Sequence, residues 1–322
     1  MLEISRLNVA VRSKGRLLPI LQDVNLTVHR DETVAIVGES GSGKSMLALA
    51  ITRLLAPVKS YEVSGQVVFE GHDLLTLGQR EMAAVRGAGI GIMFQEALGA
   101  LNPVTRVGTQ IVEALRQHRP VSAAAARAAA VEILRDVGIP APEARIDDYP
   151  HQLSGGMRQR VMIAMVLACE PRLVIADEPT TSLDVTIQSQ ILSVLRELRA
   201  MRQMSMMFIS HNLGAVAAMA DRVVVMYAGQ VVENAPAAEI FERPRHPYTR
   251  ALLAAIPRVD RVRDLSVIPG IVPRFDSLPP GCRFAPRCPY RADVCDAPQT
   301  LAAVDAAARC CRLGEIPMEV LS

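Results

Sequence analysis

Eight consecutive residues near the start of the chain have the types and spacing of a phosphate-binding loop. The run GESGSGKS fits the pattern G-x-x-x-x-G-K-[ST]. In such a loop backbone N–H groups surround a β-phosphate, the lysine neutralises the β- and γ-phosphates, and the hydroxyl ligates Mg²⁺. A glycine-rich turn without a ligand is the alternative, but the terminal Lys-Ser serves no turn geometry. We therefore expect nucleotide phosphates at Gly38, Glu39, Ser40, Gly41, Ser42, Gly43, Lys44 and Ser45.

Two adjacent carboxylates follow an apolar run further along the chain. Leu173–Ala176 is expected to be a buried strand, and Asp177 and Glu178 come directly after it. The first carboxylate can hold Mg²⁺ directly or through water, and the second can polarise an attacking water as a general base. Alone, the pair is more typical of an acidic helix cap; together with Lys44 and the segment LSGGM it indicates hydrolysis of a nucleotide.

The segment LSGGM at Leu153–Met157 narrows this hypothesis. Small residues at the start of a helix let backbone N–H groups and the helix dipole approach a phosphate. Its position between GESGSGKS and LVIADEP (Leu173–Pro179) resembles the ABC-transporter ATPase family. In that family the segment completes the ATP site of a second subunit, so hydrolysis needs a closed pair. The resemblance assigns this role to Leu153, Ser154, Gly155, Gly156 and Met157.

The same resemblance implies further site residues and the cofactors ATP and Mg²⁺. Gln95 matches the glutamine that contacts Mg²⁺ and water, and His211 matches the histidine that contacts the γ-phosphate. A lone histidine after a strand is usually an ordinary loop residue, so that assignment depends on the resemblance. Catalysis would then involve Glu178, His211 and Gln95, and Mg²⁺ would be held by Ser45, Gln95 and Asp177. Communication between the two ATP sites would use Ser182, Leu183 and Asp184.

Two departures from the family pattern affect the nucleotide base and the partner. The family usually places an aromatic residue before the phosphate loop to stack on adenine, but none occurs before Tyr61. Base affinity would then depend on aliphatic contacts around Leu17–Leu21. In addition, Met157 stands where many relatives have glutamine. That variant resembles the D-type ATPases of peptide permeases, which normally pair with a different, F-type ATPase chain.

Three longer stretches resemble the dipeptide/oligopeptide importer ATPases across essentially the whole chain. They are Phe94–Gly108, Leu153–Thr186 and His246–Pro257, the last reading HPYTRALLAAIP. The resemblance implies a complex of two transmembrane permease subunits, two ATPases and an extracytoplasmic solute-binding protein. The surface around Glu96–Val104 would receive a helix of a permease subunit; an ordinary exposed loop is the alternative.

Several rival functions remain open. Importers of nickel, glutathione and other small solutes use similar ATPases. A soluble ABC ATPase acting on DNA or ribosomes would usually carry a coiled-coil insertion, zinc modules or basic surfaces. With a net charge of +2 and interspersed charges, no such basic surface is visible, and no nucleic-acid partner is expected. An exporter ATPase would leave HPYTRALL unexplained.

The periodicity predicts α/β elements that would position these residues. The fold class is therefore α/β. The resemblance implies a P-loop NTPase (RecA-like) ABC ATPase domain at residues 1–240, with a helical signature subdomain at about 97–160. A small irregular C-terminal module is expected at 241–322, where ten prolines fall between Pro244 and Pro298. Expected strands are Thr33–Val37, Gln66–Phe69, Gly89–Phe94, Leu173–Ala176, Met206–Ile209, Arg222–Tyr227 and Gln230–Glu233; expected helices are Met46–Leu55, Ser122–Val137 and Gly156–Ala168.

Hydropathy predicts no membrane-spanning segment. The first residues alternate like a strand rather than a signal peptide, and the longest apolar run, Val161–Cys169, is far short of the roughly 20 residues that a bilayer requires. We expect a protein that is peripheral on the cytoplasmic face of the inner membrane.

Five of the six cysteines lie in the C-terminal module. Disulfides are not expected in the cytosol. Their context, GCRFAPRCPYRADVC, resembles the C-terminal segment of peptide-permease ATPases, some of which carry a [4Fe–4S] cluster. A Cys₄ zinc site and free thiols are the alternatives, because spacing alone discriminates poorly. Cys169 is expected to be a buried small hydrophobe. The resemblance assigns the cluster to Cys282, Cys288, Cys295 and Cys311, with Cys310 as a possible replacement for Cys311.

Overall fold

The computed structural model describes residues 1–57, 60–94, 97–181, 183–255, 267–299 and 308–316. These residues form two units. The first contains Met1–His29, Thr33–Thr76 and Ser210–Ser322, and the second contains Arg30–Glu32 and Leu77–Ile209. The segment after residue 240 thus belongs to the same unit as the phosphate-loop sequence, while the domain boundaries drawn from composition stay a prediction.

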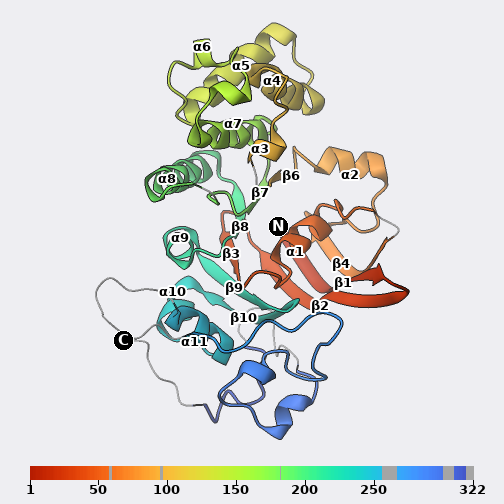
Figure 1. Ribbon diagram of the computed structural model, residues 1–322. Coiled ribbons are helices and arrows are strands. Elements are labelled where there is room, and N and C mark those ends of the chain that lie inside the picture. The colour runs from red at the N-terminus through yellow and green to blue at the C-terminus, as the bar shows by residue number, and fades with distance from the viewer. Residues whose placement is uncertain (58–59, 95–96, 182, 256–266, 300–307, 317–322) are drawn as a thin grey trace. The chain divides into compact units, whose positions relative to one another are not determined.

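The first unit contains an antiparallel sheet that is built by the N-terminal part of the chain (Figure 1, red to orange). Its strands are ordered β2 (Arg16–Val28), β1 (Leu2–Ser13), β4 (Tyr61–Phe69) and β5 (His72–Asp73). Apolar residues alternate along β1 as expected for a sheet with one buried face.

A bulge in β1 changes which residues of that strand point inward. Leu2 and Ile4 are buried before it, and Leu7 and Val9 after it, so the buried positions change from even to odd numbers. The register shifts between Ile4 and Leu7, because one extra residue is inserted there. The bulge therefore keeps four apolar side chains on one face across a change of register.

A second group of strands in the first unit supports the phosphate loop. The order is β10 (Gln230–Pro236), β9 (Arg222–Tyr227) and β3 (Thr33–Val37), with β3 parallel to β9 and β10 antiparallel to it. All five residues of β3 are buried. The helices of this unit are α1 (Lys44–Ile51), α9 (Leu213–Met219), α10 (Ala237–Glu242) and α11 (Pro247–Ala254), with the short 3₁₀ turns η3 (Ala285–Arg287) and η4 (Asp293–Asp296).

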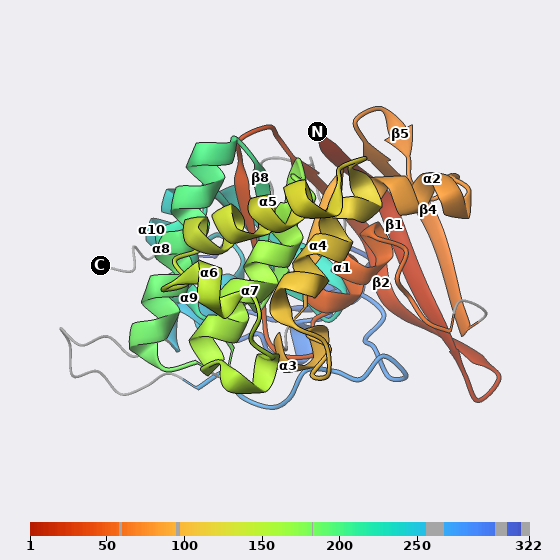
Figure 2. The ribbon, with the colours of Figure 1, turned by 90° about the horizontal axis from the view of Figure 1, so that it is seen from above.

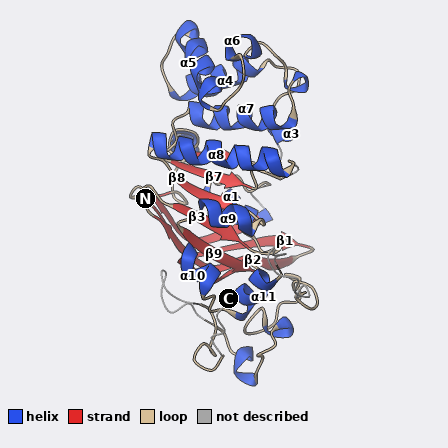
Figure 3. Cartoon of the chain, turned by 90° about the vertical axis from the view of Figure 1, so that its left-hand side faces the viewer, coloured by secondary structure: helices blue, strands red, loops and turns tan. Residues whose placement is uncertain are grey.

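The second unit combines a parallel three-stranded arrangement with a group of helices. Its strands are ordered β8 (Ser205–Ile209), β7 (Leu173–Asp177) and β6 (Ile90–Met93). Helix α7 (Gly155–Ala168) contacts β6, and Figure 3 shows α7 beside α8 (Val185–Arg202).

Short and medium helices complete the second unit. Three of them, α4, α5 and α7, pack against one another and are seen together in Figure 2. Ser122 begins α5 as expected, because its Oγ accepts the N–H of Ala125. Bounds are α2 (Gln79–Val85), α3 (Ala97–Ala100), α4 (Val107–His118), α5 (Ala123–Asp136), α6 (Pro142–Arg145) and the 3₁₀ turn η2 (Pro150–Gln152).

Most elements fall where the periodicity predicts them, with differences at the ends. The helix expected from Met46 begins two residues earlier at Lys44, and the strand expected from Gln66 begins at Tyr61. Among the described residues, no helix is both long enough and apolar enough to cross a bilayer.

Candidate functional site

The phosphate loop depends on glycines at two positions where a side chain would collide with the backbone or the core. Gly38 directly follows β3 with φ +151°, and a Cβ there would lie 2.2 Å from the carbonyl oxygen of Met226. Gly43 caps α1 with φ +101°, and a Cβ would lie 2.7 Å from Leu21 Cδ2. The loop therefore follows a path that only glycine permits at its two ends.

The side chain of Lys44 crosses the inside of this loop. Its buried ammonium donates to the carbonyl oxygens of Gly38 at 2.8 Å and Glu39 at 3.0 Å. The hydroxyl of Ser42 lies 3.4 Å from the same nitrogen, whereas Ser45 is exposed at the start of α1. A cation held by carbonyl oxygens at the start of a helix is placed to bind an anion, because phosphate oxygens are stronger acceptors for it than carbonyls.

Asp177 and Glu178 lie at the carboxyl end of β7 in the second unit. Asp177 is the last, buried residue of the strand. Glu178 has the left-handed conformation with φ +51°, and its N–H donates to Ile209 O on β8 at 2.9 Å. A non-glycine residue with positive φ carries strain that is often found at functional sites. The hydroxyl of Thr181 donates to Glu178 Oε2 at 2.8 Å, so the orientation of the carboxylate is defined.

The LSGGM segment forms an exposed helix start in the second unit. Ser154 caps α7, with its Oγ accepting the N–H of Met157 at 3.3 Å, while Ser154 and Gly155 are exposed. A Cβ on Gly156 would lie 2.7 Å from Ile187 Cγ2, so the helix approaches α8 closely. The buried Gln159 donates to the carbonyl oxygen of Pro179, which ties α7 to the chain directly after Glu178.

Two family comparisons cover the loop, the carboxylates and the C-terminal segment. Residues 21–181 match the family described as ABC transporter, and residues 232–295 match the oligopeptide/dipeptide transporter C-terminal region. The chain belongs to the ABC-transporter ATPase family. The ATPase fold class expected from the sequence is thereby confirmed, together with the oligopeptide/dipeptide branch.

Curated relatives align with this ATPase over almost its whole length. A Brucella melitensis protein named as a peptide import ATP-binding protein is 48% identical, with 98% of each chain covered. A Brucella abortus protein of the same description is 48% identical over 94% of this chain and 91% of its own.

Solved structures match the cassette part of the ATPase. The dimeric ATP-binding cassette MJ0796 in a post-hydrolysis state with ADP and Pi has a TM-score of 0.66 and 26% identity, covering 74% of this chain and 99% of its own. The Clostridium perfringens protein cbiO1, described as part of the ABC transporter complex cbiONQ, has a TM-score of 0.64 and 28% identity, covering 74% and 90%.

The C-terminal segment of the ATPase contacts the phosphate loop directly, which the sequence did not indicate. Within the first unit, the N–H of Glu39 donates to the hydroxyl oxygen of Tyr248 at 2.8 Å. The Glu39 carboxylate accepts two bonds from the guanidinium of Arg287, at 2.7 and 3.1 Å. In this conformation the Glu39 N–H is therefore occupied by Tyr248, although we expected every N–H from Glu39 to Lys44 to surround a phosphate.

The sequence His246-Pro247-Tyr248 forms the start of helix α11. His246 caps α11, with Nδ1 accepting the N–H of Tyr248 at 3.0 Å, and Pro247 is the first helical residue. The carboxylate of Glu233 accepts the N–H groups of Arg245 and His246, which fixes the entry to the helix. This arrangement points Tyr248 at the phosphate loop. The only sequence signal was the three-residue pattern itself, whose partners are distant in the chain.

The other residues expected in the ATP site are Gln95, Ser182, Asp184 and His211. Gln95 and Ser182 lie outside the described residues. Asp184 caps α8 by accepting the N–H of Ile187 at 2.9 Å. His211 is exposed before α9, and it belongs to the first unit with the phosphate loop, whereas Asp177, Glu178 and LSGGM belong to the second.

The aliphatic stretch expected to contact the base lies in β2. Leu17 is 46% exposed there, while Leu21 is buried and reaches the phosphate-loop cap at Gly43. Leu17 belongs to the same unit as the phosphate loop and is exposed, so it is available for contact with a base. No Phe, Tyr or Trp precedes it in the sequence.

The five C-terminal cysteines are free thiols that influence one another. The pKa of Cys282 is raised to about 11, mainly by burial, with smaller contributions from Cys288 and Cys310. Burial also raises the pKa values of Cys288 and Cys310. The charge of Cys295 raises both pKa values as well. Cys311 is exposed, and burial and Cys295 raise its pKa.

Among the described residues, these thiols do not form an arrangement that could hold a metal ion. Over the described ranges, no group of three or more His, Cys, Asp or Glu side chains is placed to hold a metal ion. The expected [4Fe–4S] ligand set is therefore unsupported by the geometry. Cys169, expected to be buried, is half-buried, with Sγ 3.6 Å from Ala114 O.

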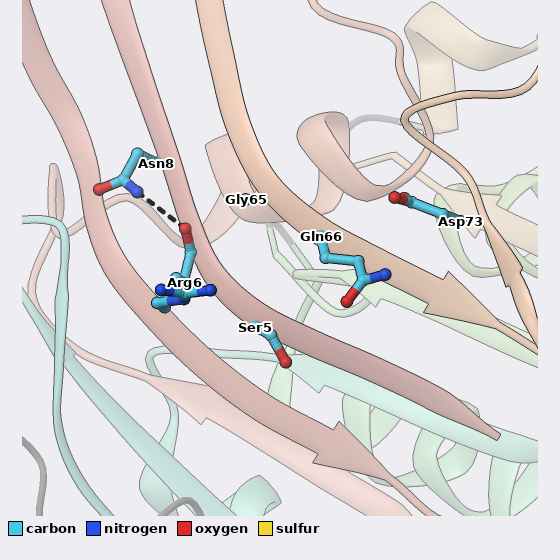
Figure 4. A pocket seen from close by; sticks show the side chains of 6 residues that line it. All are labelled: Ser5, Arg6, Asn8, Gly65, Gln66 and Asp73. Carbon is cyan, nitrogen blue, oxygen red and sulfur yellow. Dashed lines mark hydrogen bonds between the residues drawn. The ribbon is translucent and has the colours of Figure 1, made fainter.

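A polar hollow of about 500 Å³ lies at the β1 bulge rather than at the phosphate loop. Figure 4 shows its lining residues, with Asn8 Nδ2 donating to the carbonyl oxygen of Arg6 at 2.7 Å. A Cβ on Gly65 would lie 2.3 Å from that same oxygen, so the bulge requires glycine opposite it. The hollow is thus a product of the bulge geometry; its lining residues are Ser5, Arg6, Asn8, Gly65, Gln66 and Asp73.

Proposed function

We propose that this ATPase powers the import of di- and oligopeptides across the cytoplasmic membrane. The observation that carries the proposal is the match of residues 232–295 to the oligopeptide/dipeptide transporter C-terminal region. Relatives named as peptide import ATP-binding proteins, similar over nearly the full length, support it. Import of nickel, glutathione or another small solute is the alternative, because the substrate is chosen by other subunits.

In the proposed reaction the phosphate loop binds the nucleotide. Lys44 exchanges its carbonyl partners Gly38 and Glu39 for β- and γ-phosphate oxygens, and loop N–H groups donate to the β-phosphate. The exposed hydroxyl of Ser45 would ligate Mg²⁺ together with Asp177 and Gln95. The ion would neutralise charge that develops on the phosphates.

Glu178 is the proposed general base for the attacking water. Its carboxylate is oriented by Thr181 and its backbone by Ile209, and an oriented carboxylate can accept a proton from water. His211 would contact the γ-phosphate. A base held in one orientation loses less entropy in the transition state than a mobile one.

The exposed start of α7 is the proposed contact to the ATP of a second ATPase. Ser154 and Gly155 present a helix N-terminus, which favours a phosphate. The partner is proposed to be a different, F-type chain, as Met157 suggests. Two permease subunits and an extracytoplasmic solute-binding protein would complete the importer, with this ATPase peripheral on the cytoplasmic face of the inner membrane.

Uptake by a deletion strain tests the proposed substrate. Labelled dipeptides, longer peptides and nickel are offered to cells that express the wild-type chain or Lys44→Ala. Peptide uptake that requires Lys44 supports the proposal. If nickel uptake requires Lys44 while peptide uptake is the same in the wild-type and Lys44→Ala strains, the ATPase serves a nickel importer instead.

We also propose that the C-terminal thiols hold a [4Fe–4S] cluster that stabilises the segment. The donor type fits, because thiolates are the ligands of such clusters, but the thiols would have to move from their present arrangement. The proposed ligands are Cys282, Cys288, Cys295 and Cys311, with Cys310 as the replacement for Cys311: Cys311 interacts with Cys295, and Cys310 interacts with Cys282 and Cys288. Zinc and free thiols remain the alternatives, which metal analysis distinguishes.

A further inference from the structure

The phosphate loop of this ATPase carries a negative charge of its own. Glu39 is the second residue of GESGSGKS, and its carboxylate belongs to a loop that receives several negatively charged phosphates. Like charges at such short range oppose binding unless a cation neutralises one of them. Neutralisation of Glu39 would therefore favour nucleotide binding.

Arg287 is built to supply that neutralisation. Its side chain is 4% exposed, and each of its two terminal nitrogens donates a hydrogen bond to one carboxylate oxygen of Glu39. Its Nε donates to Pro269 O at 2.8 Å, and a terminal nitrogen lies 3.3 Å from the Tyr227 hydroxyl. The guanidinium fork is thus held in place before the loop is loaded, and a two-pronged contact of this kind is among the strongest charge-assisted bonds.

A cluster of aromatic rings holds the second contact. Tyr248 accepts the Glu39 N–H at 2.8 Å, and its ring lies 4.6 Å from that of Tyr227 and 5.4 Å from that of Phe284. All three rings are almost fully buried. The hydroxyl of Tyr248 therefore cannot leave the loop without disturbing this cluster.

The C-terminal segment also reaches the far arm of the loop through the β9–β10 turn. The buried Arg283 donates to the carbonyl oxygen of Ala228, and the next N–H, that of Gly229, donates to Ser42 O at 2.8 Å. Both arms of the loop, at Glu39 and at Ser42, are thus connected to the same segment.

We propose that Arg287 and Tyr248 are positioning residues of the ATP site: Arg287 cancels the charge of Glu39, Tyr248 fixes its backbone, and the C-terminal segment thereby sets the affinity for nucleotide phosphates. The inference goes beyond the proposed transport function and rests only on the use of the loop for ATP. A merely structural brace would change stability but would not discriminate between nucleotides by charge.

Equilibrium binding of fluorescent ATP, ADP and AMP analogues to the purified full chain tests the proposal. For Arg287→Met we expect ATP affinity to fall about tenfold or more, ADP affinity less, and AMP affinity least, because the uncompensated carboxylate repels the phosphate charge. The double variant Glu39→Gln/Arg287→Met removes that carboxylate, so ATP affinity should return to within about threefold of wild type. Tyr248→Phe keeps the ring and loses the acceptor, and should weaken ATP binding by a smaller factor.

Arg274→Met is the matched control, because Arg274 lies in the same segment, is 79% exposed and forms an ion pair with nearby Asp276. It should bind all three nucleotides as the wild type does. Thermal unfolding of each variant shows whether it is folded. Equal ATP affinity of folded Arg287→Met and wild type would overturn the inference, as would a double variant no better than Arg287→Met. Failure of the wild type to bind ATP would instead contradict the proposed function.

Discussion

The hydroxyl of Thr181 donates a 2.8 Å hydrogen bond to Oε2 of Glu178. The contact joins the residue proposed as general base to a side chain three positions later, across the turn that ends β7. Glu178 reaches it with the left-handed φ of +51°, and its N–H is held by Ile209 O. The turn therefore fixes both the backbone and the carboxylate of this residue.

Replacing Thr181 by Val should lower turnover without changing nucleotide binding. The substitution keeps the branched shape and removes the donor, so Glu178 loses its orientation and kcat should fall about tenfold while KM stays within about twofold. Steady-state ATPase assays of the assembled transporter measure both. Thr186→Val, at an exposed position of α8, is the control and should leave both constants unchanged. A change in KM alone would show that Thr181 does not act through the base.

Glu178→Gln should bind ATP normally but lose turnover in the assembled complex. The amide keeps the size of the side chain and the acceptor for Thr181, yet it cannot take a proton from water. Loss of a general base typically costs about 10²- to 10⁴-fold in rate. Single-turnover assays with radiolabelled ATP measure the chemical step directly, and near-normal activity would refute the role given to Glu178.

His246 should make the stability of this ATPase fall in mild acid. Burial, with the charges of Arg309 and Arg250, lowers its pKa to about 3 from an ordinary value of 6.5. Below pH 6.5 the unfolded chain therefore takes up a proton that the folded chain excludes, and stability is lost as the pH falls toward 3. From pH 7 to 5 the loss from this residue is about 2 kcal/mol.

Urea unfolding at pH 7 and pH 5 measures this loss. His246→Asn keeps an acceptor for the Tyr248 N–H and has no titrating group, so its stability should depend less on pH by about that amount. His72→Asn, at an exposed position, should retain the wild-type dependence. The same pH dependence in His246→Asn and wild type would show that the ring is protonated in the folded state.

The thiol variants should separate Cys310 from Cys311. If the segment holds an iron–sulfur cluster, anaerobically purified protein should contain about four iron and four sulfide per chain. Cys311→Ser should lose them, and Cys310→Ser should keep them. The opposite pattern would identify Cys310 as the fourth ligand instead. Stoichiometric zinc would identify the other metal, and protein without iron or zinc would leave the five thiols reduced.

Local features of this chain were predictable, and distant ones were not. The phosphate loop and the Ser122 cap depend on neighbours in sequence, and both appear where the residues indicate. The β1 bulge at Arg6 depends on pairing with Gly65, and alternation alone did not reveal the change of register. Likewise no local pattern links Glu39 to Arg287, because this contact depends on how the C-terminal segment packs. Gln95 and Ser182 lie outside the described residues.

The pair formed by Glu39 and Arg287 joins residues 248 positions apart. Closing so long a loop costs more entropy than any contact within GESGSGKS, and during synthesis Arg287 leaves the ribosome after the whole cassette. The loop can therefore take its local shape early, but Glu39 acquires a counter-charge only when the segment that contains Arg287 has been made. Chains that are cut short before Arg287 consequently keep an uncompensated carboxylate beside the phosphate position, which sets incomplete copies apart from complete ones.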